Sequence, residues 1–222
     1  MQVMLLFTKN GNLLSLKTKL KNSLYGLVLA GGKSTRMKQD KATLDVHGKS
    51  QITFCYELLA PICDQVFIST RQDQLDSRNL KDYLQIHDIE PFLNSGPLGG
   101  ILSAMMQHPE ADWLVVACDL PYLTPKTIKY LIQQRNRKKM ATAFISTEDN
   151  LPEPLCAVYE AHALDALMNF RKDGGMCPRK FMINHDVELL AQPDKKALIN
   201  VNNPEEYRKA RSFFLENKTR KS

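Results

Sequence analysis

The stretch LAGGKSTRMKQDK, residues 29–41, says most about the fold of this chain of 222 residues. It continues an apolar run, Leu24–Ala30, which has the length and composition of a buried parallel strand. Gly31 and Gly32 allow a sharp turn after that strand and a close approach of the backbone to a ligand. Successive backbone N–H groups in such a turn form a concavity for phosphate oxygens. The stretch therefore predicts a phosphate-binding loop on a strand-to-helix turn.

Two cations in this stretch support the same interpretation. Arg36 can hold a phosphate through its planar guanidinium, and Lys41 adds a compact positive charge. The spacing matches neither the Walker loop nor the dinucleotide pattern GxGxxG. A bare Gly-Gly pair would indicate an ordinary turn with solvated cations. The Ser, Arg, Met and Asp-Lys that follow at this spacing favour phosphate binding.

The rest of the chain alternates apolar runs with segments of helical spacing. This order predicts an α/β fold with a mostly parallel sheet and helices on both of its faces. We predict strands over Leu24–Ala30, Gln65–Thr70, Tyr83–His87, Trp113–Ala117, Met140–Ser146, Leu155–Tyr159 and Ala197–Val201. We predict helices over Ser50–Ile62, Pro97–Gln107, Ala161–Phe170 and Pro204–Phe214, and one that begins at Thr124 and Pro125. Ligands of such sheets bind at the carboxyl ends of the strands.

An aspartate follows the most apolar of these strands. Asp119 comes just after Trp113–Ala117, so it projects at the carboxyl edge of the sheet. A hard carboxylate there suits Mg²⁺ bound together with triphosphate oxygens. A turn-capping role before Pro121 is the alternative for this residue alone. The phosphate loop earlier in the chain favours the metal site.

Three further segments carry candidate site residues. Gly96, in NSGPLGGI (residues 94–101), allows the backbone to approach a ligand, although a simple helix entry would also explain it. In INVNNPEE (residues 199–206), side-chain alternation on the predicted strand points Asn200 and Asn202 the same way. A helix start, with Asn203 as its cap and Pro204 at its first position, accounts for part of that segment.

These motifs resemble one family, the molybdenum cofactor guanylyltransferases of the MobA type. Residues 29–41 are similar to its signature LAGGxSxRMGxDK, residues 96–101 to its GPLAGI segment, and residues 199–206 to its NVNTPEEL. The stretch PEPLCAVY (residues 152–159) resembles a family strand beside the acceptor site. Two departures stand out. Lys38 occupies a position where the family has Gly, and Ser69-Thr70-Arg71 stands where the family has an Asn after its second strand.

The resemblance implies a fold, a reaction and a site. The fold is a three-layer Rossmann-like nucleotidyltransferase fold, and the reaction transfers GMP from GTP to the phosphate of the molybdenum–molybdopterin cofactor, with release of pyrophosphate. Implied catalytic residues are Arg36, Lys41 and Asp119, and implied nucleotide-binding residues are Leu29, Ala30, Gly31, Gly32, Lys41, Asp88, Gly96 and Asp119. Asp119 and Asn202 would bind Mg²⁺, and Asn200, Arg179 and Lys180 would contact the acceptor.

Two alternative functions remain open at this point. One is a cytidylyltransferase that uses CTP on molybdopterin or on another phosphorylated acceptor, since the missing Asn bears on base recognition. The other is a protein that binds a nucleotide or the cofactor without catalysis. The resemblance also implies transient contacts with molybdenum cofactor enzymes or insertion factors.

Composition sets the remaining expectations. We predict an extension over residues 1–23, a nucleotidyltransferase domain over 24–216 and a basic tail over 217–222. The net charge of +6 is compatible with anionic substrates, but no arginine-rich helix with interleaved aromatic residues predicts nucleic-acid binding. Five scattered cysteines suit a reducing cytoplasm, and no apolar run reaches the ~20 residues that a membrane span needs.

Overall fold

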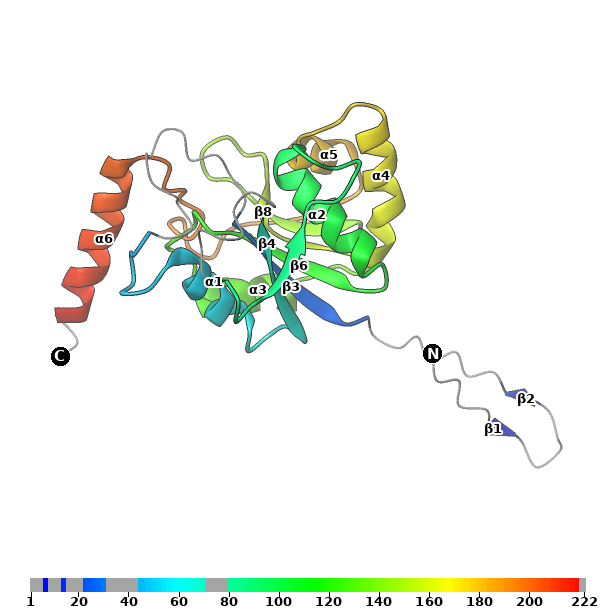
Figure 1. Cartoon of the computed structure of the whole chain (residues 1–222), viewed down its shortest axis with the longest axis horizontal. Coiled ribbons are helices and arrows are strands. Elements are labelled where there is room, and N and C mark those ends of the chain that lie inside the picture. The colour runs from blue at the N-terminus through cyan, green and yellow to red at the C-terminus, as the bar shows by residue number, and fades with distance from the viewer. Residues whose placement is uncertain (1–5, 8–12, 15–21, 31–43, 71–79, 220–222) are drawn as a thin grey trace.

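The computed structural model describes residues 6–7, 13–14, 22–30, 44–70 and 80–219. Two short strands near the N-terminus, β1 (Leu6–Phe7) and β2 (Leu13–Leu14), pair antiparallel and form a sheet of their own (Figure 1). The main sheet has seven strands in the order β5-β4-β3-β6-β8-β7-β9. Its strands are β3 (Leu24–Leu29), β4 (Gln65–Thr70), β5 (Leu84–His87), β6 (Asp112–Ala117), β7 (Ala141–Ile145), β8 (Pro152–Tyr159) and β9 (Glu188–Leu190).

The main sheet is mostly parallel, as predicted. Strands β5, β4, β3 and β6 run parallel to one another, and β7 runs parallel to β9. Only β8 runs against the strands on either side of it. The start of β8 therefore lies beside the end of β6, and this arrangement brings a second segment to the carboxyl edge of the parallel strands.

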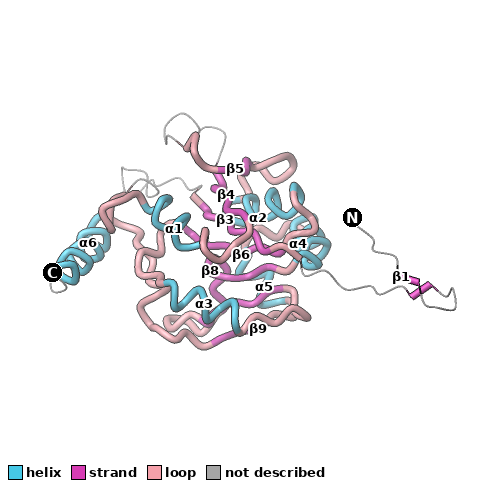
Figure 2. The backbone as a smooth tube through the Cα atoms, turned by 90° about the horizontal axis from the view of Figure 1, so that it is seen from below, coloured by secondary structure: helices cyan, strands magenta, loops and turns pink. Residues whose placement is uncertain are grey.

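Helices cover both faces of this sheet, which gives the predicted three layers (Figure 2). One face packs on α1 (Gln51–Leu59) and α3 (Pro125–Gln133), and the other on α2 (Gly96–Gln107), α4 (Leu164–Lys172) and α5 (Pro178–Asn184). Alternation along the strands sorts the side chains between the faces: in β6, Val116 packs with the first set of helices and Val115 with the second. Ser50 caps α1 and Thr124 caps α3. The cap at Thr124 confirms the prediction from the sequence.

The C-terminal helix α6 (Pro204–Thr219) lies at one end of the molecule, away from these two layers (Figure 1). Its inner residues form a small separate cluster with the segment after residue 44: Val46, Val201 and Ala210 are buried there. Asn203 caps the helix through its side-chain oxygen, which accepts from the N–H groups of Glu205 and Glu206 at 3.1 and 3.0 Å. The interpretation of Asn203 as a helix cap is confirmed.

One predicted strand was wrong. Ala197–Val201 forms a turn and an irregular segment instead of a strand. Its backbone N–H groups bond within turns, from Ala197 to Asp194 and from Ile199 to Lys196, or to the loop after β6. Hence strand alternation does not orient Asn200 and Asn202. The edge position beside β7 belongs to β9, which the sequence did not predict, and helix α5 was also missed.

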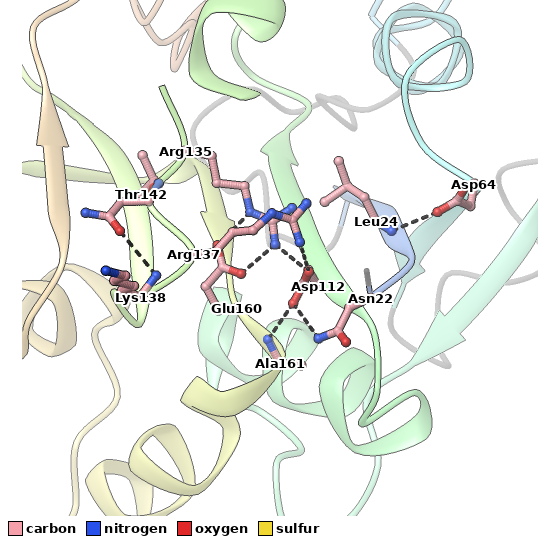
Figure 3. Close-up of polar contacts among 11 residues, drawn as sticks. Asn22, Leu24, Asp64, Asp112, Arg135, Arg137, Lys138, Thr142, Glu160 and Ala161 are labelled. Atoms are coloured by element: carbon pink, nitrogen blue, oxygen red, sulfur yellow. Dashed lines mark hydrogen bonds and ion pairs between the residues drawn. The ribbon is translucent and has the colours of Figure 1, made fainter. Parts of the chain in front are cut away.

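A buried ion network joins three elements at the other end of β6 (Figure 3). Arg135 contacts Asp112 and Glu160 at 2.5 Å each, and all three side chains are at most 3% exposed. Asp112 also accepts from the Ala161 N–H at 3.0 Å and from Asn22 at 3.1 Å. The network ties the starts of β3 and β6 to the end of β8. It lies at the edge of the sheet opposite the expected site.

Candidate active site

The carboxyl ends of four parallel strands form the edge where the site was predicted. β3 ends at Leu29 and Ala30 follows it; both residues are buried. The Ala30 N–H donates to the Ser69 carbonyl at 3.1 Å, and the Cys118 N–H donates to the Leu29 carbonyl at 3.2 Å. The chain therefore enters the predicted phosphate loop between the ends of β4 and β6. Gly31, Gly32, Arg36 and Lys41 lie outside the described residues.

Asp119 lies at the same edge, one residue after Cys118 and half-buried. Its carbonyl accepts from the Val201 N–H at 2.9 Å, which fixes the segment that carries Asn202 against the loop after β6. Two residues predicted to bind one metal thus come from neighbouring backbone segments. Asn202 itself is exposed, and its N–H donates to Glu206 at 2.6 Å.

The predicted nucleoside side of the site lies at the ends of β4 and β5. Thr70 is 1% exposed, and its hydroxyl bonds to Nδ1 of His87 at 3.1 Å. Asp88 follows directly, and its Oδ2 would lie 3.5 Å from a Cβ added at Gly99 in α2. The structure therefore brings Asp88 close to the first turn of α2, which Gly96 opens with a φ of 59°. Only a residue tolerant of positive φ suits that position.

A polar groove lies on the far side of the β6 end, where the acceptor residues were predicted. Its volume is about 60 Å³. It is lined by Ser146, Thr147, Glu148, Asp149, Glu153, Arg179, Gln192, Lys195, Leu198, Ile199 and Asn200. The structure thus brings Arg179 and Asn200 into one groove. Lys180 is exposed and does not line it.

Arg179 is held in this groove by two carboxylates. Its guanidinium contacts Glu153 at 2.9 Å and Asp149 at 2.7 Å. Burial raises the pKa of Glu153; the Arg179 charge works against this rise, and the charges of Asp119 and Asp149 add to it. Glu153 at the start of β8 is therefore close enough to Asp119 to feel its charge. The groove and the end of β6 belong to one electrostatic environment.

Three buried thiols lie under this edge. Cys55, Cys118 and Cys156 come from α1, the end of β6 and β8. Burial, with smaller effects of Cys118, Asp119 and Cys156, raises the pKa of Cys55 well above its usual value, and burial raises the pKa of Cys156. Thiols in such surroundings stay protonated and are poor nucleophiles. No group of three or more His, Cys, Asp or Glu side chains within the described residues is arranged to hold a metal ion.

Comparison with known proteins assigns the family. Residues 26–192 match the MobA-like NTP transferase domain. The chain belongs to this family. It is 36% identical to a molybdenum cofactor biosynthesis bifunctional protein of Synechocystis sp. over 83% of the chain, but it spans only 52% of that relative. It is 30% identical to a probable molybdenum cofactor guanylyltransferase of Nostoc sp., over 83% of the chain and 89% of the relative.

A solved structure supports the fold of this family. The molybdopterin-guanine dinucleotide biosynthesis protein A of Archaeoglobus fulgidus superposes with a TM-score of 0.71 at 22% identity, over 86% of this chain and 99% of that protein. The prediction of an α/β nucleotidyltransferase fold is confirmed, and so is the prediction of a nucleotidyltransferase. No helix among the described residues is both long and apolar enough to cross a membrane.

Sequence reasoning did not single out Gln51, a buried polar residue that lines a cavity with Asp119. Gln51 is 2% exposed. The signal available in the sequence was a glutamine among the core positions of the Ser50–Ile62 helix. Such a polar residue is more often found on a solvated helix face.

Proposed function

We propose that this protein transfers GMP from GTP to the terminal phosphate of the molybdenum–molybdopterin cofactor and releases pyrophosphate. The observation that carries the proposal is the position of Asp119, between the entry to the phosphate loop at Ala30 and the groove that holds Arg179 and Asn200. A nucleotide on one side and a phosphorylated acceptor on the other would meet at this carboxylate. The name of the Nostoc relative, a probable molybdenum cofactor guanylyltransferase, points to the same transfer, and that of the Synechocystis relative to molybdenum cofactor biosynthesis.

In this reaction the protein positions the two substrates and neutralises the charge on their phosphates. An oxygen of the acceptor's terminal phosphate attacks the α-phosphorus, the new P–O bond forms, and the bond to the β-phosphate oxygen breaks in line. The acceptor phosphate is already ionised, so no general base is required. Arg36, Lys41 and the backbone N–H groups after Ala30 would stabilise the charge that develops on the pyrophosphate. The buried thiols of Cys55 and Cys156 are not needed as nucleophiles in this reaction.

The residues at the end of β6 fit a magnesium ion. Asp119 offers a carboxylate and Asn202 an amide oxygen, and these are the hard donors that Mg²⁺ prefers. Mg²⁺ is held by one or two carboxylates with several waters and substrate phosphates, so a full cage of protein ligands is not needed. When bound, the ion would neutralise charge on the triphosphate. Asp119 would hold it, and Asn202 would complete its surroundings.

The acceptor would bind in the groove through Arg179. In the structure this guanidinium is paired with Glu153 and Asp149, at an exposed fraction of 30%. A phosphate offers the same planar pairing as a carboxylate, and an exposed pair such as Arg179–Asp149 is weak enough to exchange. Asn200, which lines the same groove, would contact the same acceptor.

The first test is a thermal-shift titration with GTP, CTP, ATP and UTP, each with and without Mg²⁺, followed by an assay of pyrophosphate release with purified acceptor. GTP is expected to raise the melting temperature most. If CTP stabilises the protein more than GTP does, the proposed activity would be cytidylyl transfer instead of guanylyl transfer. Nucleotide binding without any pyrophosphate release would favour the non-catalytic alternative.

The second test is Asp119→Asn, which keeps the size of the side chain but removes its charge. The variant is expected to fold normally by circular dichroism, to bind nucleotide weakly, and to lose most turnover at millimolar Mg²⁺. Near-normal turnover at low Mg²⁺ would remove Asp119 from the metal site and leave it a turn-capping role.

A further inference from the structure

Gln51 is a buried amide with both polar atoms unsatisfied. It is the first residue of α1, and its side chain is 2% exposed. Neither Nε2 nor Oε1 has a hydrogen-bond partner among the described residues. A buried amide that makes no hydrogen bond is unfavourable, so such a group in a folded protein calls for an explanation. A leucine or methionine would fill the same space without this cost.

The side chain faces a small cavity that it shares with Asp119. The cavity measures about 10 Å³ and is lined by Leu44, Val46, Gln51, Cys118, Asp119, Pro121 and Val201. This volume is about the least that can hold one water molecule. Apolar groups make up most of the wall. The amide of Gln51 and the carboxylate of Asp119 are the strongly polar side chains on it.

The segment that carries Gln51 is fastened to the loop that carries Asp119. The Gln51 N–H donates to the Leu44 carbonyl at 3.1 Å, which closes the turn before α1. Nε2 of His47, within that turn, lies 2.9 Å from the Pro121 carbonyl; because a carbonyl only accepts, Nε2 carries the proton. The His47 ring also stacks on Phe54 at 3.9 Å. The segments that carry Gln51 and Asp119 are therefore tied together beside the cavity that both residues line.

We propose that Gln51 is a positioning residue for Asp119 and acts through one water molecule in this cavity. A water can accept from Nε2 of Gln51 and donate one proton to its Oε1 and the other to the Asp119 carboxylate, which satisfies both polar atoms of the amide. The water would fix the orientation of the Asp119 carboxylate and so favour its binding of Mg²⁺. This inference rests on the proposed function in one respect, the assignment of Asp119 as a metal ligand.

The test uses the full chain and two apolar replacements, Gln51→Leu and Gln51→Met, so that one remains if the other folds poorly. The matched control is Gln85→Leu, because Gln85 in β5 is a partly buried glutamine whose amide donates to the Leu80 carbonyl at 3.1 Å. Three measurements are made on each: the melting temperature without metal, the affinity for Mn²⁺ in the presence of GTP by electron paramagnetic resonance, and the Mg²⁺ dependence of pyrophosphate release. A high-resolution crystal structure of the wild type shows whether the cavity holds a water.

The expected result separates stability from metal binding. The Gln51 variants should melt within about 2 °C of the wild type, since an apolar group replaces a buried amide and its water. Their Mn²⁺ affinity should fall about fivefold, the effect of one lost hydrogen bond on the ligand, and half-maximal activity should need correspondingly more Mg²⁺. Gln85→Leu should leave both metal readouts unchanged.

Other outcomes overturn the inference or separate it from the proposed function. Unchanged Mn²⁺ affinity in both Gln51 variants, or an empty cavity in the crystal structure, would overturn it. If the wild type binds Mn²⁺ with GTP but releases no pyrophosphate, the proposed transfer fails, and the Mn²⁺ affinities still decide the role of Gln51. If the wild type binds no Mn²⁺ with or without GTP, the assignment of Asp119 fails and the inference with it.

Discussion

Replacing Arg135 with methionine should destabilise the fold more than any change of an exposed charge. Arg135 holds Glu160 through two hydrogen bonds, Nε to Oε1 at 2.6 Å and Nη2 to Oε2 at 2.5 Å, and contacts Asp112 at 2.5 Å (Figure 3). The side chain is 2% exposed. In Arg135→Met, a side chain of similar length leaves two buried carboxylates without their shared cation.

The size of the effect follows from this burial. Breaking a buried ion pair by removing one partner costs about 3–5 kcal/mol, because the remaining charge is left uncompensated. A domain of this size loses about 2–4 °C in melting temperature per kcal/mol, so Arg135→Met should melt roughly 6–20 °C lower. The matched control is Arg137→Met. Arg137 lies 3.4 Å from the same Asp112, but its side chain is 42% exposed, so its loss should cost about 1 kcal/mol or less.

The pH dependence of the free energy of unfolding provides a second, independent test of the role of Arg135. Burial alone would raise the pKa of Asp112, but the Ala161 N–H, the charge of Arg135 and the hydrogen bonds of Arg135 and Asn22 outweigh it, so its pKa is lowered. An aspartate with a lowered folded-state pKa contributes stability above its unfolded pKa of about 3.9, and this stability is lost as the pH falls through the folded pKa. Arg135→Met removes the charge that lowers this pKa and leaves burial, which raises it, as the largest remaining influence on Asp112. The folded variant should therefore protonate Asp112 at a higher pH than the unfolded chain does, which relieves its uncompensated charge, whereas the wild type keeps the contribution of Asp112 down to about pH 3.9. The difference in stability between wild type and variant should narrow as the pH falls from 7 toward 4.

Urea unfolding followed by circular dichroism at pH 7, 5.5 and 4 measures both effects. The reasoning is refuted if Arg135→Met lies within about 1 kcal/mol of the wild type at pH 7, the range of an exposed pair. It is refuted as well if Arg137→Met is equally damaging, or if the gap between Arg135→Met and the wild type does not change with pH.

Three further outcomes are expected. Lys41→Ala should weaken GTP binding roughly tenfold in a calorimetric titration, the contribution of one charge-assisted phosphate contact, and an unchanged affinity would show a solvated lysine. Gly99→Ala would set a Cβ 2.6 Å from the Phe92 carbonyl oxygen, so it should cost about 1–3 kcal/mol in urea unfolding; a wild-type midpoint would mean that α2 adjusts freely. Arg179→Gln should raise the KM for the acceptor about tenfold, whereas Lys180→Gln, outside the groove, should stay within about twofold; equal effects would place the acceptor elsewhere.

Local sequence determined those parts of the structure whose stabilising interactions lie within a single segment of the chain. The run Leu24–Leu29 is apolar enough to form a buried strand between two others. Asp119 could be located at the carboxyl edge because it directly follows the fully buried β6. Thr124 and Asn203 could be predicted as helix caps, because a capping side chain accepts hydrogen bonds from backbone N–H groups two or three residues later in the chain.

Tertiary structure decided whatever depends on a partner distant in the chain. The apolar stretch Ala197–Val201 has strand-like composition, but a strand needs a free edge, and β9 takes the edge beside β7 while the Val201 N–H bonds to the loop after β6. The reversal of β8 sets Glu153 near Asp119, and the packing of α1 buries Gln51 beside it. Hydrogen bonds and cavities of this kind form between segments that composition and spacing describe only one at a time. Their chemistry becomes visible only when the folded chain brings those segments together.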